Sequence, residues 1–140
     1  MPLVDPAAIP QVQLPFMNED HAEEARLLNG LADALAALRG GAGARDDVLA
    51  RWAALDRHTR EHFERENEAM RRVGFPAYPM HQAEHERVLA EMAGEARTFV
   101  DHGDAERLWT YVSQAVPAWF VRHIQTMDQI TARFVAMTGG

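Results

Sequence analysis

Three of the seven histidines of this chain fall within one short stretch, REHFERENEAMRRVGFPAYPMHQAEH, which spans residues 60–85. His62 is followed four residues later by Glu66, and His81 is followed four residues later by His85. Residues four apart lie on the same face of a helix, about one turn from each other. Imidazole is a good ligand for iron, zinc, copper and nickel. Each pair therefore indicates a metal-binding face, provided that the stretch is helical and that the face is buried.

Two further histidines stand in short polar motifs near the ends of the chain. His21 lies in NEDHAEE, and His123 lies in FVRHIQTMD, with Asp128 five residues after it. Taken alone, an H-x-x-x-E or H-x-x-x-H pair more often belongs to a solvated helix face than to a metal site. Five histidines and a glutamate turned toward one interior are much harder to explain in that way, because buried imidazoles and carboxylates need partners.

The composition limits the other possibilities. The chain has 140 residues, which is typical of one domain, and 47% hydrophobic with 25% charged residues, which is typical of a soluble globular protein. A net charge of −7 argues against a nucleic-acid partner. The absence of cysteine excludes disulfides, thiolate metal sites and a cysteine nucleophile. The first twenty residues lack a basic region and are broken by prolines, so we expect neither a signal peptide nor a membrane span, and a cytoplasmic location.

Proline and glycine divide the chain into elements of helical length. Prolines at positions 2, 6, 10 and 15 predict an extended arm over residues 1–16. Apolar residues at helical spacing then predict four helices, roughly 18–39, 45–73, 80–102 and 104–138. Pro117 lies inside the last of these and predicts a kink. The fold class is therefore all-α: a single domain, residues 1–140, folded as an antiparallel up-down-up-down four-helix bundle.

The histidines and Glu66 of these motifs lie on the apolar faces of the predicted helices, and these faces point into the bundle. His21 shares its face with Leu28, and His62 and Glu66 share theirs with Leu55. On the third helix His81 and His85 lie beside Val88 and Met92, and on the fourth His123 lies beside Val116 and Ile130. Each helix therefore turns at least one strong metal ligand toward the axis of the bundle.

The four motifs together resemble the hemerythrin family. They are an isolated His21, H-F-x-x-E at 62–66, H-x-x-x-H at 81–85 and H-x-x-x-x-D at 123–128. The flanking segments GFPAYPMHQAEH and WFVRHIQTMD are similar to those of bacterial members, and the resemblance covers nearly the whole chain after the arm. It implies a non-haem centre of two iron ions, bridged by an oxo or hydroxo group, that binds dioxygen for storage or delivery.

The resemblance also implies a division of the ligands. One iron takes His81, His85 and His123, the other takes His21 and His62 and keeps an open position, and Glu66 and Asp128 bridge the two. Asp128 rests on the resemblance alone, since a residue five positions after His123 points about 140° away from it on a regular helix.

Two residues depart from the family pattern. In oxygen-carrying hemerythrins the position three after the first histidine is usually apolar, and here it is Glu24; His58 stands one turn before His62, where the family has no ligand. Glu24 lies about one turn after His21, and His58 lies about one turn before His62. Because the first two helices run antiparallel, both steps move in the same direction along the bundle, by about 5 Å. Glu24 and His58 are therefore predicted to share a layer beside the iron that has the open position. They are candidates for an extra ligand or a hydrogen-bonded neighbour. Alternatively, Glu24 reaches solvent and His58 only pairs with a nearby carboxylate.

The expected pocket for a small ligand is lined by Leu28, Phe63, Trp119 and Ile124. The favoured function is binding of dioxygen or of another small diatomic or peroxide ligand, rather than catalysis. The alternative is a redox enzyme or sensor acting on peroxide or nitric oxide, with fast oxidation in air, if the Glu24 and His58 layer makes the pocket polar. The sequence leaves the oligomeric state open.

Overall fold

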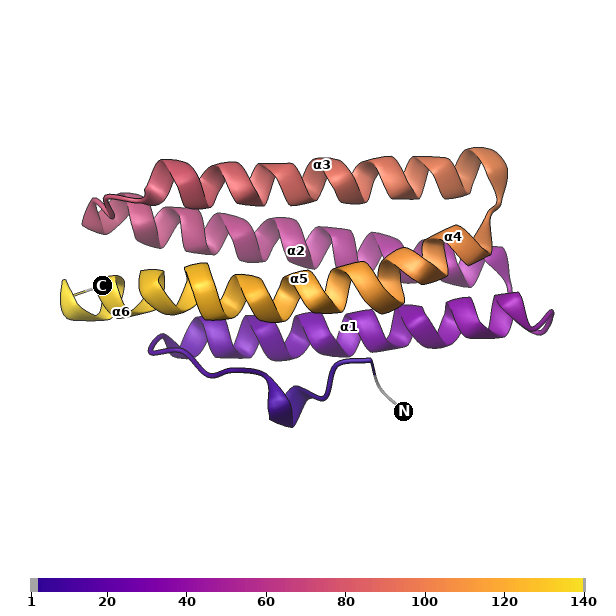
Figure 1. Cartoon of the computed structure of the whole chain (residues 1–140), viewed down its shortest axis with the longest axis horizontal. Helices are drawn as coiled ribbons and strands as arrows, with labels where there is room; N and C mark the ends of the chain where they lie inside the picture. The colour runs from indigo at the N-terminus through magenta and orange to yellow at the C-terminus, as the bar shows by residue number, and fades with distance from the viewer. Residues whose placement is uncertain (1–2, 140) are drawn as a thin grey trace.

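The computed structural model describes residues 3–139, and every regular element in that range is helical. The bundle is built from α1 (Pro15–Arg39), α2 (Arg45–Val73), α3 (Tyr78–His102) and a fourth run divided into α4 (Ala105–Thr110), α5 (Val116–His123) and α6 (Gln129–Met137). Figure 1 shows these runs packed side by side, with consecutive runs pointing in opposite directions. The predicted all-α four-helix bundle is confirmed.

Contacts between helix ends match this arrangement. Arg39, the last residue of α1, donates to the carboxylate of Glu106 at the start of α4, with Nε 2.8 Å from Oε1. Arg45, the first residue of α2, donates to the backbone carbonyl of Val100 near the end of α3, at 2.8 Å. Gly74 ends α2 with a φ of +64°, a backbone conformation that favours glycine.

The N-terminal arm is shorter than predicted. It contains a turn of 3₁₀ helix, η1 (Pro6–Ala8), and α1 already begins at Pro15, because proline is well suited to the first position of a helix. Asn18 of α1 holds the arm by two bonds to the backbone of Val12, each 2.9 Å long. Met1 and Pro2, also assigned to the arm, lie outside the described residues.

The fourth run is not the continuous helix predicted over 104–138. Two π-helical segments, Tyr111–Ala115 and Ile124–Asp128, separate its α-helical parts. Pro117 has no N–H to donate to the carbonyl four residues earlier, and the first π segment lies directly before it, with Val116 bonded five residues back to Tyr111. The predicted kink is therefore a widened turn, and Figure 1 shows the run bending between α4 and α5.

The interior is apolar over most of its length. Leu28, Leu31 and Leu35 of α1 are 1%, 0% and 0% exposed and form one buried apolar stripe, as the helical spacing of apolar residues in this segment implies. None of the described helices combines the length and apolar character needed to cross a bilayer.

Candidate metal centre

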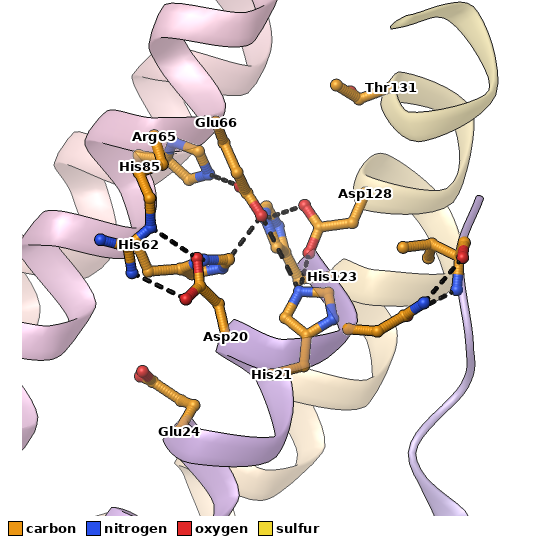
Figure 2. Close-up of polar contacts among 12 residues, drawn as sticks. Asp20, His21, Glu24, His62, Arg65, Glu66, His85, His123, Asp128 and Thr131 are labelled. Carbon is orange, nitrogen blue, oxygen red and sulfur yellow. Dashed lines mark hydrogen bonds and ion pairs between the residues drawn. The ribbon is translucent and has the colours of Figure 1, made fainter. Parts of the chain in front are cut away.

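Ten polar residues are buried in the described part of the chain. They are His21, Thr59, His62, Glu66, Asn67, His81, His85, His123, Asp128 and Thr131. The seven predicted ligands are all among them, and none of the seven is more than 5% exposed. They come from all four helical runs and converge around Glu66 and Asp128. Figure 2 shows His21, His62, His85 and His123 around these two carboxylates.

Five of these side chains form a first group, whose potential ligand atoms all lie within 4.8 Å of one another: Glu66, His81, His85, His123 and Asp128. His85 Nε2 lies 3.0 Å from Glu66 Oε1. His81 Nε2 and His123 Nε2 each lie 3.1 Å from Asp128 Oδ1. Three imidazoles therefore face one oxygen of each carboxylate.

A second group lies beside the first and shares both carboxylates: His21, His62, Glu66 and Asp128. His62 Nε2 lies 2.9 Å from Glu66 Oε2, and His21 Nε2 lies 2.9 Å from Asp128 Oδ2. Each carboxylate thus turns one oxygen toward the three-histidine group and its other oxygen toward the two-histidine group. Both carboxylates are therefore shared between the two groups.

The second π segment explains how Asp128 joins the cluster. On a regular helix its side chain would point away from His123. Within Ile124–Asp128 the hydrogen bonds span five residues instead of four, as the bond from Gln129 N–H to the Ile124 carbonyl illustrates. The turn is therefore wider than an α-helical turn and rotates Asp128 back toward His123, whose Nε2 lies 3.1 Å from Asp128 Oδ1.

Several atoms at the centre of the cluster have no hydrogen-bond partner. They include both carboxylate oxygens of Glu66, His85 Nε2 and Asp128 Oδ1, all of them buried. Burial acts to raise the pKa of both carboxyl groups, but the surrounding imidazoles outweigh it, so the pKa values of Glu66 and Asp128 lie below their usual range. These oxygens and His85 Nε2 lie close together but form no hydrogen bonds with one another. A cation bound between them would satisfy groups that are otherwise costly to bury.

Three histidines are oriented by partners on their outer nitrogen. His81 Nδ1 lies 2.8 Å from the hydroxyl of Thr131, and His85 Nδ1 lies 3.0 Å from the amide oxygen of Asn67. His62 Nδ1 donates to Asp20 Oδ2 at 2.9 Å. The Asp20 and Asn67 oxygens accept only, and the Thr131 hydroxyl can accept too, so each contact suits a proton on Nδ1. The Nε2 lone pair is then directed at the cluster, which is the form that binds a metal.

The comparisons with known proteins agree with this site. The family model described as "Hemerythrin HHE cation binding domain" matches residues 13–135. The chain belongs to the hemerythrin family. It is 32% identical over 120 residues to "Bacteriohemerythrin" of Ralstonia nicotianae, covering 86% of this chain and 80% of that protein. It is 29% identical over 134 residues to "Bacteriohemerythrin" of Aquifex aeolicus, covering 94% and 96% respectively.

The resemblance stated from the motifs is thereby confirmed. Family membership and the buried His/Glu/Asp cluster together make this chain a non-haem iron-binding protein.

Glu24 and His58, the residues that depart from the hemerythrin pattern, lie near each other. Glu24 Oε2 is 3.4 Å from His58 Nε2, and Glu24 Oε1 accepts a 2.6 Å hydrogen bond from the hydroxyl of Thr59. His58 Nε2 also lies 3.0 Å from the backbone carbonyl of Asp20, to which it donates. Glu24 is outside both groups of converging ligand atoms, and Figure 2 shows it one turn from His21 on α1.

An apolar cavity begins at this layer. It has a volume of about 30 Å³, enough for one or two molecules the size of water. Leu28 and Trp119, two of the expected pocket residues, line it together with Glu24 and Thr59. Burial raises the pKa of the Glu24 carboxyl in these surroundings.

The other two expected pocket residues do not line this cavity. Phe63 instead stacks on His85, with ring centroids 3.9 Å apart and an interplanar angle of 6°. Ile124 is fully buried directly after His123. The cavity extends along the bundle toward residues that precede His62 and His123 in the chain, such as Leu55 and Val116. Phe63 and Ile124 follow these histidines and therefore lie away from it.

The hydrogen-bond partners of Glu24 and of the histidines were missed in the sequence. Thr59 carried a usable signal, because it lies three residues before His62 on the same buried face. Asp20, Asn67 and Thr131 each reach a histidine on another helix, with sequence separations of 42, 18 and 50 residues. Helical spacing within one segment does not reveal such pairs.

Proposed function

We propose that this chain binds two iron ions and reversibly binds dioxygen at one of them. The observation that supports this most is the sharing of both carboxylates between two unequal groups of imidazoles. In this proposal His81, His85 and His123 would hold one iron, His21 and His62 would hold the other, and both irons would share Glu66 and Asp128. Imidazole with carboxylate is a donor set that suits non-haem iron.

When bound, the iron pair supplies redox chemistry, since each ferrous ion can give one electron to dioxygen. The two-histidine group has one imidazole fewer, and it therefore leaves room for an exogenous ligand, as catalytic metal sites do. The chain's own residues exclude bulk water from that position. Leu28, Trp119 and Phe120 line the apolar cavity nearby, whose size and character suit a small apolar molecule.

A second candidate is redox turnover, and the layer of Glu24, His58 and Thr59 favours it. Glu24 Oε2 is buried without a hydrogen-bond partner beside the apolar cavity. A carboxylate there offsets positive charge from bound cations and makes that end of the cavity polar. Replacing Glu24 with leucine should then slow oxidation of the ferrous protein in air and lengthen the life of any oxygenated form. An unchanged oxidation rate leaves reversible binding as the function.

The test is the visible spectrum of the protein loaded anaerobically with ferrous iron, recorded before and after exposure to dioxygen. Reversible binding predicts a new absorption band that disappears when dioxygen is removed and returns when it is added. Immediate and irreversible conversion to the ferric spectrum contradicts reversible binding and supports turnover. A protein that binds fewer than two irons per chain contradicts the site itself.

A further inference from the structure

The histidine partners differ between the two groups of ligands. In the three-histidine group the outer nitrogens of His81 and His85 face neutral acceptors, the Thr131 hydroxyl and the Asn67 amide oxygen. In the two-histidine group His62 faces a carboxylate, that of Asp20, while His21 Nδ1 is buried with no partner. Asp20 is therefore the one charged acceptor among these outer contacts in the described part of the chain.

Asp20 is held in place from several sides. Arg65 donates to both of its oxygens, from Nε to Oδ2 at 2.8 Å and from Nη2 to Oδ1 at 2.7 Å. His58 donates to its backbone carbonyl. Paired with the Arg65 guanidinium through both of its oxygens, Asp20 is a carboxylate, and Figure 2 shows it between Arg65 and His62.

An ionised acceptor changes the imidazole that donates to it. Hydrogen bonds to charged acceptors are about twice as strong as those between neutral groups. A carboxylate on Nδ1 raises the basicity of the ring, and thus strengthens the bond from Nε2 to a metal. The group with fewer imidazoles is therefore the one whose outer partner is charged.

We propose that Asp20, clamped by Arg65, is a positioning residue that strengthens His62 as a ligand and so compensates the two-histidine position for its missing imidazole. This rests on the proposed two-metal site. At the two-histidine position, but not at the three-histidine position, Asp20 should make a divalent cation bind more tightly. It should also lower the reduction potential of an iron bound there, because a stronger donor favours the ferric ion.

The first test is a titration of metal-free protein with Co²⁺, which binds imidazole and carboxylate and reports on coordination through its visible spectrum. Wild type should bind two equivalents. His62→Ala identifies the equivalent that belongs to the two-histidine position, because that equivalent is lost. Asp20→Asn should weaken this same equivalent by about 10–100-fold and leave the other within about threefold, which is the range for loss of such a partner.

Three further variants separate this role from general stability. Asp56→Asn removes a surface carboxylate that pairs with Arg60 at 3.0 Å but contacts no histidine, and should change neither equivalent. Arg65→Gln leaves the Asp20 carboxylate but removes its clamp, and should weaken the same equivalent by a smaller factor; it also serves if Asp20→Asn does not fold. In a His62→Ala background, Asp20→Asn should leave the remaining equivalent unchanged.

The iron-loaded protein gives a second readout. Asp20→Asn should raise the reduction potential of one iron only. Equal affinities in wild type and Asp20→Asn, equal weakening of both equivalents, or an unchanged pair of potentials overturns the role of Asp20. A wild-type protein that binds only one Co²⁺ and only one iron overturns the proposed two-metal site instead.

Discussion

The two ligand groups of the cluster share their carboxylates but differ in the packing and polarity of the residues near them. The three-histidine group is closed by packing: Phe63 stacks on His85 at 3.9 Å and Trp119 stacks on His123 at 4.5 Å, measured between ring centroids. The two-histidine group lies next to the polar layer of Glu24 and the apolar cavity. In the proposed function, the first group would hold a metal and the second would hold a metal and admit a ligand, as closed structural and open catalytic sites differ.

Removing the metals should have the largest effect. Ligands that bind only the native state stabilise it by about 4 kcal/mol at a concentration 1,000-fold above Kd, which for a chain of this size raises Tm by roughly 10–15 °C. We expect the first equivalent, at the three-histidine position, to supply more than half of that rise. Calorimetry of the metal-free protein with zero, one and two equivalents measures it. Equal Tm values with and without metal would show that the cluster holds no cation.

Loss of one imidazole should empty the weaker position. His62→Ala leaves His21 as the sole histidine of its group, and metal analysis should fall from two to one per chain. The control is His102→Ala, because His102 is exposed at the end of α3 and outside both groups. If His62→Ala retains both metals, the two-histidine group is not a metal position.

Much of this arrangement was predictable from the spacing of residues. His62 with Glu66, and His81 with His85, stand four apart within regular helices, so their shared faces follow from the helical period. The same rule does not predict the direction of the Asp128 side chain. That direction depends on the π segment Ile124–Asp128, whereas the rule assumes a regular α-helix. The resemblance to hemerythrins supplied it.

The remaining differences come from tertiary packing. Asp20 directly precedes His21 in the chain but contacts His62 on the next helix, and only the relative placement of α1 and α2 determines this. Phe63 and Ile124 were expected in the pocket because they adjoin histidines, yet the cavity extends away from them along the bundle. The positions of Phe63 and Ile124 next to histidines in the sequence predicted that they lie near the cluster. They did not predict on which side of the cluster the cavity lies.

A variant of a neutral histidine partner should have the opposite site preference to Asp20→Asn: it should affect the three-histidine group and not the two-histidine group. Thr131→Val removes the hydroxyl that faces His81 Nδ1 and keeps nearly the same shape. We expect about tenfold weaker binding at the three-histidine position and no change at the other. Co²⁺ titration measures both, and Thr126→Val, on an exposed hydroxyl that contacts only the Arg122 carbonyl, is the control. A change at the two-histidine position instead would reverse the assignment of the two groups.

The smallest expected effect concerns the packing of Trp119. Its Nε1 donates to Glu84 Oε2 at 2.8 Å. The pKa of Glu84 is lowered to about 2, mainly by the hydrogen bond from Arg87 and to a smaller extent by the one from Trp119. A lowered pKa gives stability that is present above the unfolded pKa of about 4.5 and is lost as the pH falls toward 2. Glu84→Gln should therefore cost about 1 kcal/mol at pH 6 and much less at pH 3.

Urea unfolding of the metal-free protein measures that difference at each pH. A cost that stays constant between pH 6 and pH 3 would mean that the charge of Glu84 does not support Trp119. The position of Trp119 against His123 would then depend on packing alone.

Mössbauer spectroscopy of the anaerobic ferrous protein, loaded with isotopically enriched iron, tests the central claim most directly. Two irons held by unequal groups of imidazoles and joined by Glu66 and Asp128 should give two quadrupole doublets of equal area at two irons per chain. A single doublet, from one iron per chain or from two identical irons, would contradict the account.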